Sequence, residues 1–258
     1  MLLTFYKYQG TGNDFVLIDN RLLKFPKNNT KLVGSLCDRK FGIGADGFIL
    51  LENDELSDFN MVYFNADGNE GSLCGNGGRC TVAFAKYLNI IGDETTFNAA
   101  DGLHQASIKN GIVSLQMQDV AEIKEKPNYV FLDTGSPHHV QMVENVKDFK
   151  VFEEGKKLRY GLYGKSGSNI NFVEARENHV FAVRTYERGV ENETLSCGTG
   201  VTAVALAMHN AGKTDTNEVT IMTEGGELKV QFKEEDGVYK EIFLIGPAQQ
   251  VFKGELEC

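Results

Sequence analysis

Two stretches of small and apolar residues dominate the hydrophobic pattern of this chain. They run over residues 74–88 and 197–208, and each begins with Cys-Gly-x-Gly. Apolar side chains recur on nearly every face of both stretches, as they do in a helix that is buried on all sides. The pattern therefore predicts two buried helices, with Cys74 and Cys197 at their N-termini.

Around these helices the pattern changes to short runs of strand length, separated by turn dipeptides such as Asp-Gly, Asn-Gly and Gly-Gly. A further helix is predicted from Thr30 to about Phe41, with Thr30 as its cap and Gly42 as its stop. Strands are expected over residues 3–8, 15–19, 48–51, 59–64, 95–99, 103–109, 112–117, 180–186, 218–223, 228–232 and 238–245.

The order of elements occurs twice along the chain. Each buried helix is followed by a short meander of strands, and Asn65 and Glu187 each end a strand shortly before a cysteine. Residues 12–16 also have a loose echo in residues 168–173. Strands followed by a helix, without βαβ alternation, indicate an α+β fold. We expect two pseudo-symmetric domains, each a mainly antiparallel sheet wrapped round a central buried helix.

A charged segment without periodicity, residues 119–128, indicates where the first half ends. The expected domains are residues 1–122, which carry Cys74, and residues 123–249, which carry Cys197, with the tail 250–258 packing back on the first. Two such halves place two helix N-termini on opposite sides of a cleft, where the active site is expected.

Composition narrows the function. The net charge of −10 argues against a nucleic-acid partner and against binding to anionic membranes. The start of the chain lacks the features of a signal peptide, so a cytoplasmic location is expected, and the five cysteines are interpreted as reduced thiols. Their spacing does not fit a metal site, so no metal is expected.

The helix N-termini give the two thiols a chemical character. A helix N-terminus offers backbone N–H groups and a partial positive charge, which lower the pKa of a cysteine placed there. Two such thiols suit a reaction that removes a proton from one face of a carbon and returns one to the other. The alternative is that Cys74 and Cys197 are inert buried thiols, which their recurrence in one context disfavours.

Residues 42–47 match Gly-x-Gly-x-x-Gly. In a dinucleotide-binding site this motif follows a strand and opens a helix. Here it follows the helix predicted from Thr30 and precedes a strand, so we reject a nucleotide site.

Several motifs together resemble the diaminopimelate epimerase family, in family order over nearly the whole chain. No single motif is decisive, but the ordered set is specific. They are Lys7–Phe15 (KYQGTGNDF), Gly42–Gly47 (GIGADG), Phe64–Gly68 (FNADG), Cys74–Cys80 (CGNGGRC), Tyr186–Gly189 (YERG) and Cys197–Gly200 (CGTG).

The resemblance implies an epimerase that uses no cofactor and interconverts LL- and meso-2,6-diaminopimelate, on the route to lysine and peptidoglycan. It implies that Cys74 and Cys197 act as a thiolate and thiol pair, assisted by His138 and Glu187. Backbone N–H groups at the two helix N-termini would stabilise the carbanion. The family's substrate-binding positions correspond to Asn13, Asn65, Gly75, Asn76, Ser136, Asn169, Glu187, Arg188, Gly198 and Thr199.

Within these positions Arg188 fits a bidentate grip on the distal carboxylate of the substrate. Ser136 stands where asparagine is common in the family, which puts its substrate contact in question. Family members are often homodimers, and the same is expected here.

Two other functions stay open. A proline, hydroxyproline or histidine racemase-like member of the same fold is one, although residues 12–15 and the Glu187–Arg188 pair favour diaminopimelate over proline. A histidine-type substrate is harder to exclude. The other is a thiol redox sensor or a ligand-binding module, in which Cys74 and Cys197 form a disulfide on oxidation.

Overall fold

The structure, a computed structural model, describes residues 2–71, 73–177 and 179–257. Its internal contacts divide the chain into two compact units. Unit 1 comprises Met1–Leu115 and Gly246–Cys258, and unit 2 comprises Gln116–Ile245. Unit 1 is thus built from both ends of the chain, and unit 2 from its middle.

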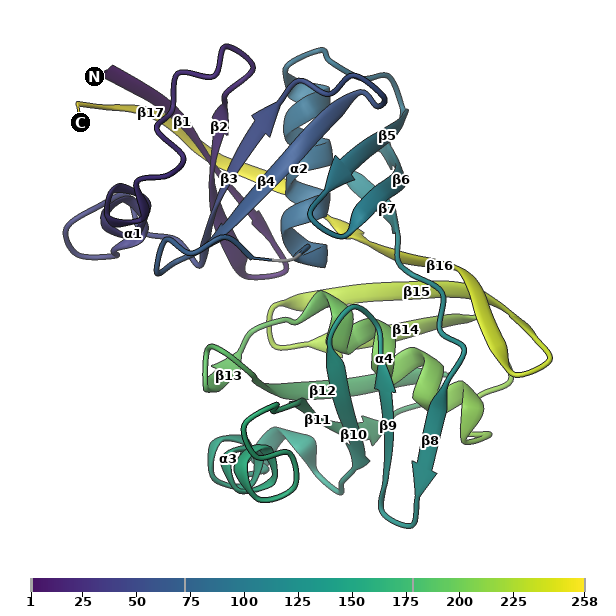
Figure 1. Ribbon diagram of the computed structural model, residues 1–258. Coiled ribbons are helices and arrows are strands. Elements are labelled where there is room, and N and C mark those ends of the chain that lie inside the picture. Colours follow the sequence, from purple (N-terminus) through teal and green to yellow (C-terminus); the bar gives the residue numbers. More distant parts are fainter. Residues whose placement is uncertain (1, 72, 178, 258) are drawn as a thin grey trace. The chain divides into compact units, whose positions relative to one another are not determined.

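Unit 1 contains two helices and a sheet of mixed direction (Figure 1). Its elements are β1 (Leu2–Gly10), β2 (Asn13–Asp19), α1 (Thr30–Cys37), β3 (Gly47–Glu52), β4 (Phe59–Asn65), α2 (Gly75–Tyr87), β5 (Glu94–Ala99), β6 (Gly102–Lys109), β7 (Ile112–Gln116) and β17 (Gln249–Glu257). The β1 strand pairs antiparallel with both β17 and β2. From there the sheet continues through β2–β3 parallel, β3–β4 antiparallel, β4–β5 parallel, and β5–β6 and β6–β7 antiparallel.

Unit 2 repeats this plan. Its elements are β8 (Ile123–Lys126), β9 (Tyr129–Asp133), β10 (Pro137–Met142), the 3₁₀ turn η1 (Val146–Asp148), α3 (Val151–Gly161), β11 (Asn169–Ala175), β12 (Val180–Glu187), β13 (Asn192–Thr194), α4 (Gly198–Asn210), β14 (Glu218–Thr223), β15 (Gly226–Glu235) and β16 (Val238–Pro247). Strand β9 pairs antiparallel with β8 and β10. Pairing continues through β10–β11 parallel, β11–β12 antiparallel, β12–β14 parallel, and β14–β15 and β15–β16 antiparallel.

The two pairing orders match strand for strand, which confirms the α+β fold class and the internal repeat. The pairing orders also correct one detail of the predicted repeat. The loose echo of residues 12–16 in residues 168–173 aligns β2 with β11, whereas the pairing order makes β10 the counterpart of β2. Both segments begin a buried strand with small and polar residues, and this local similarity does not identify the strand.

Helices α2 and α4 are the buried helices predicted from the pattern. Helix α2 contacts β1, β2, β3, β4, β6 and β17, and α4 contacts β9, β10, β11, β12 and β15, the counterparts of the first five, together with β14. Nearly all side chains from Val201 to Met208 are fully buried in unit 2. Figure 1 shows α2 lying against the strands of its own unit. A helix enclosed in this way has almost no solvated face, which explains why most of its side chains are small or apolar.

The first strands of unit 1 are apolar on both faces because each face is covered by a helix. Val33 and Leu36 of α1 pack with Val16 and Phe48 on one face. On the other face, the Tyr6 ring packs against Phe84 of α2 in a tilted arrangement. Successive strand residues point to opposite faces, so a strand covered on both sides is a continuous apolar run.

Two local expectations were wrong. The cap of α1 is Asn29, whose side chain accepts from the Leu32 N–H, and not Thr30. The helix ends at Cys37 and does not reach Phe41, because the Asp38 carboxylate accepts the N–H groups of the next turn and competes with the helix. Among the described residues no helix is long and apolar enough to cross a membrane.

Candidate active site

Cys74 is the N-cap residue of α2, with an extended backbone (φ −98°, ψ 118°). Its carbonyl oxygen accepts the Gly78 N–H at 2.7 Å, which closes the first helical turn. The N–H groups of this turn point out of the helix and carry its partial positive charge. Gly77 keeps the turn closely packed, because a Cβ there would lie 3.2 Å from the end of the Ile49 side chain, which would have to shift to admit it.

Two asparagines lie beside this thiol. The side-chain oxygen of Asn13, at the start of β2, accepts from Asn76 Nδ2 at 3.2 Å and from Cys74 Sγ at 3.5 Å. Asn65 ends β4 directly across from Gly47, and its side chain is exposed. Unit 1 thus brings Asn13, Cys74 and Asn76 into direct contact and leaves Asn65 open to solvent.

Arg79, in the same helix, was given no role from the sequence. It is fully buried, and its Nη2 donates to Thr11 Oγ1 at 3.2 Å. Burial lowers the pKa of Arg79 to about 10, against the opposing influence of Cys80 and Cys74. The guanidinium therefore stays protonated near neutral pH, and its charge favours the thiolate form of a nearby cysteine. An arginine inside a helix of small and apolar residues was the signal available in the sequence.

In unit 2, Cys197 is the N-cap residue of α4, again with an extended backbone (φ −122°, ψ 111°). Its Sγ lies 3.5 Å from Thr199 Oγ1, and the Thr199 carbonyl accepts from Thr134 Oγ1 at 2.8 Å. A hydroxyl can donate to a thiolate as well as accept from a thiol. The two cysteines thus differ, because Cys74 faces an amide oxygen, which only accepts.

His138 lies fully buried in the centre of a polar network. Its Nδ1 is 3.1 Å from the Asn171 amide nitrogen, which can only donate, so Nδ1 is the acceptor and the ring proton lies on Nε2. That Nε2 is 3.0 Å from both Ser136 Oγ and Thr199 Oγ1. Burial, helped by the charge of Arg188, lowers the pKa of His138 to about 3. His138 is therefore a neutral hydrogen-bond donor to the residues beside Cys197.

Ser136, whose role was in question, belongs to this network. Its hydroxyl lies 3.2 Å from Thr199 Oγ1 and accepts from Asn169 Nδ2 at 3.1 Å. The Asn169 oxygen accepts the backbone N–H of Arg188 at 2.8 Å, which fixes the turn after β12. Ser136, Asn169 and the start of that turn therefore form one hydrogen-bonded group.

The two charged residues of that turn are held in different ways. Glu187 Oε2 accepts from Thr194 Oγ1 at 2.9 Å, and Arg188 Nη1 donates to the Ser166 carbonyl at 3.1 Å. The other donors of the Arg188 guanidinium fork can bind a carboxylate. Unit 2 thus groups Ser136, His138, Asn169, Arg188 and Thr199 around the start of α4.

Asn171 is a second residue that the sequence reasoning missed. It is fully buried on β11, where Nδ2 also donates to the His139 carbonyl at 2.9 Å and Oδ1 accepts from Thr185 Oγ1 at 3.0 Å. A Cβ on Gly200 would lie 2.6 Å from that oxygen. A second asparagine, two positions after Asn169 in a mostly apolar strand, was the available signal, since buried polar groups are nearly always hydrogen-bonded.

Solved structures with this fold are found among racemases and related proteins. A PhzF-family phenazine biosynthesis protein from Bacillus anthracis superposes with a TM-score of 0.81, at 14% identity, over 100% of both chains. A hydroxyproline epimerase from Agrobacterium vitis superposes with a TM-score of 0.74, at 14% identity, over 99% of this chain and 92% of its own. At these identities the likeness shows the fold alone.

Sequence comparison is more specific. A protein of Flavobacterium psychrophilum named diaminopimelate epimerase is 62% identical over 250 residues, which cover 96% of this chain and 98% of the relative. One of the same name from Chlorobaculum tepidum is 41% identical over 258 residues, with 96% and 98% covered. The family profile described as diaminopimelate epimerase matches residues 5–122 and 130–251. The chain is therefore an enzyme that belongs to the diaminopimelate epimerase family.

Proposed function

We propose that this enzyme interconverts LL- and meso-2,6-diaminopimelate, with Cys74 and Cys197 as its two bases and without a cofactor. The observation that carries the proposal is the repeated placement of a thiol at the N-cap of a buried helix. Membership of the diaminopimelate epimerase family supports diaminopimelate as the substrate. A cytoplasmic role in lysine and peptidoglycan precursor synthesis goes with this reaction.

The reaction exchanges one proton for another at a single carbon. One cysteine, as thiolate, takes the α-proton and becomes a thiol. The other, as thiol, delivers its proton to the opposite face and becomes the thiolate, so charge and protons balance. In the intermediate the electron pair is delocalised into the α-carboxylate, where N–H groups of Gly75, Asn76, Gly198 and Thr199 stabilise the added charge.

The other residues expected at the site either bind the substrate or assist the cysteines. Asn13, Asn65 and Asn169 supply amide groups that suit an ammonium or a carboxylate, and Arg188 suits the distal carboxylate. Since His138 is neutral and donates towards Thr199 and Ser136, we assign it a positioning role beside Cys197. Glu187 is retained as an assisting group.

The direct test is proton exchange with solvent. The enzyme is incubated with LL-diaminopimelate in deuterium oxide, and deuterium is expected at one α-carbon of the product, as measured by mass spectrometry and proton NMR. Proline, hydroxyproline and histidine under the same conditions serve as controls. Deuterium in one of these amino acids, with none in diaminopimelate, would assign the chain a different substrate within the fold.

We also propose that the enzyme is a homodimer formed through the β1–β17 region of unit 1. Strand β17 presents Val251 and Phe252 with 57% and 45% of their surfaces exposed, and Leu2 on β1 is 67% exposed. Exposed apolar side chains on the end strand of a sheet favour self-association. We expect a dimer in sedimentation velocity and a monomer for Phe252→Glu. A wild-type monomer at all concentrations would exclude the dimer.

A further inference from the structure

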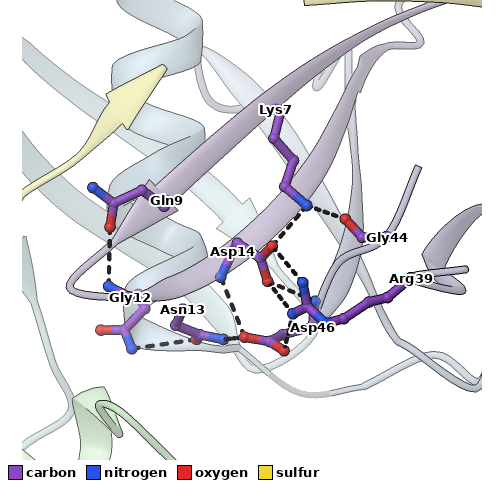
Figure 2. Close-up of polar contacts among 9 residues, drawn as sticks. Lys7, Gln9, Gly12, Asn13, Asp14, Arg39, Gly44 and Asp46 are labelled. Carbon is purple, nitrogen blue, oxygen red and sulfur yellow. Dashed lines mark hydrogen bonds and ion pairs between the residues drawn. The ribbon is translucent and has the colours of Figure 1, made fainter. Parts of the chain in front are cut away.

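A cluster of four charged residues lies beside Asn13, and the proposed reaction does not use it. Lys7 Nζ lies 2.7 Å from Asp14 Oδ2 and also donates to the Gly44 carbonyl. Arg39 contacts Asp14 through two hydrogen bonds of 3.0 and 2.6 Å, and its Nη2 donates to Asp46 at 2.7 Å. Figure 2 shows these contacts as one connected group. Two cations and two carboxylates thus join β1, β2 and the loop before β3.

The glycine-rich motif that was rejected as a nucleotide site builds this loop. Gly44 has φ of +80°, and a Cβ there would lie 2.9 Å from the Arg39 backbone. The Asp46 N–H donates to the Asp14 carbonyl at 2.9 Å. The loop is therefore bound to the start of β2 through both backbone and side chains, which places the Asp46 carboxylate beside Asn13.

The two ends of the Asn13 amide have different partners. Its Nδ2 donates to Asp46 Oδ2 at 2.8 Å, and its oxygen faces Asn76 and Cys74 (Figure 2 shows the Asp46 contact). An amide can rotate by half a turn with little change in shape, so its partners decide which end faces which way. A carboxylate accepts hydrogen bonds and cannot donate them, so only the NH₂ end can face Asp46.

We propose that Asp46 is a positioning residue, which holds the Asn13 amide with its oxygen towards Cys74 and so favours the protonated thiol of Cys74. A thiol can donate to that oxygen and a thiolate cannot. With the amide reversed, an N–H group would face the sulfur and favour the thiolate. The proposal rests on the proposed function in one respect. In that reaction a cysteine in its thiol form delivers a proton, and the orientation of Asn13 keeps Cys74 in that form.

Other groups near Cys74 act on its charge in the same way whether or not Asp46 is present. They are the N-terminus of α2, the Arg79 guanidinium and Cys80, the last a fully buried thiol whose pKa burial raises to about 12. Lys7, Arg39 and Asp14 contribute through charge. In Asp14, burial raises the pKa, but hydrogen bonds from Arg39 and Lys7 outweigh burial and bring it down to about 2, so Asp14 stays ionised. Removal of the Asp46 carboxylate thus has two effects: the Asn13 amide loses its acceptor, and the net charge of the cluster becomes more positive.

The test measures the reactivity of the Cys74 thiol. Iodoacetamide is added to the full-length enzyme between pH 5.5 and 9, and alkylation of each cysteine is followed by peptide mass spectrometry. Asp46→Ala is expected to alkylate Cys74 about fivefold faster at pH 7 and to lower the pH midpoint for that residue, since a tenfold change in thiolate corresponds to one pKa unit. Cys197 is expected to react at the wild-type rate.

Two variants separate the amide from other effects. Asp19→Ala serves as the control. It removes a carboxylate that binds an arginine, Arg21, but does not contact Asn13, and it is expected to leave the alkylation rate of Cys74 unchanged. The double variant Arg39→Gln/Asp46→Ala restores the net charge of the four-residue cluster but not the hydrogen-bond acceptor for Asn13. It is therefore expected to alkylate Cys74 as fast as Asp46→Ala does. A return to the wild-type rate in this double variant, or equal rates in Asp46→Ala and Asp19→Ala, would overturn the proposal. No substrate is used, so failure of the proposed function would show separately, in the deuterium experiment.

Discussion

Cys74→Ser and Cys197→Ser are each expected to lower the rate of diaminopimelate epimerisation by about 10³-fold or more, while the protein stays folded. Serine has nearly the shape of cysteine, but its hydroxyl does not ionise near neutral pH, so it replaces neither the thiolate base nor the thiol acid. The loss of one group that transfers a proton typically costs a factor of about 10² to 10⁴. The measurement is the initial rate of conversion of LL- to meso-diaminopimelate at saturating substrate.

The chain provides an internal control for these variants. Cys37 packs in the apolar cluster between α1 and the sheet, and burial raises its pKa to about 12. Cys37→Ala is expected to lower thermal stability and to keep the wild-type rate per folded molecule. If Cys74→Ser or Cys197→Ser retained substantial epimerisation, the two-base mechanism would be refuted. If the wild type had no epimerase activity, a redox sensor or a binding module would be the better interpretation.

Stability against unfolding is expected to fall as the pH drops from about 6.5 towards 3, largely because of His138. In the folded enzyme burial lowers the pKa of this ring to about 3, whereas an unfolded histidine titrates near 6.5. Between these values the unfolded chain binds a proton that the folded enzyme does not. The free energy of unfolding therefore decreases by about 1.4 kcal/mol per pH unit, and the total loss reaches about 4 kcal/mol near pH 3.

This pH dependence is measured by urea unfolding at pH 4.5, 5.5, 6.5 and 7.5. His138→Gln is expected to be less stable than the wild type at pH 7.5 and to show a shallower pH dependence. Burial also lowers the pKa of His139, so part of the slope is expected to remain in that variant and to disappear in the double variant with His139→Gln. A slope unchanged by His138→Gln would show that this ring does not stay neutral in the folded enzyme.

The parts of the fold with a strong hydrophobic pattern were predictable from the sequence. Helices α2 and α4 carry small or apolar residues on nearly every face, and strands such as β3 and β12 stand between clear turn signals. By contrast, α3 was not predicted, because its apolar face is narrow and most of its other residues are charged. Strand β8 carries three charged residues and lies in the segment interpreted as a boundary. Its pairing with β9 depends on tertiary contacts that a local pattern does not report.

Among the site residues, the sequence singled out those in motifs and missed those that hold them. Cys74, Cys197 and Asn13 stand in recognisable motifs. Asn171 contacts His138, and Asp46, although it stands in the Gly42–Gly47 motif, contacts Asn13, across 33 positions of the chain in each case. The sequence marks such residues at most as polar positions in an apolar strand or in a glycine-rich motif, and only the folded arrangement shows which asparagine faces which partner.

Strand β17 has a consequence for the order in which the enzyme can fold during translation. It pairs with β1 along the length of that strand, from Leu2 with Glu257 to Gln9 with Gln249. A ribosome makes all of unit 2 before it makes β17, so β1 has an open edge throughout the synthesis of unit 2. Exposed edges of this kind recruit other chains. Unit 1 thus completes its sheet only after nearly the whole chain has been made, and until then β1 is exposed to aggregation.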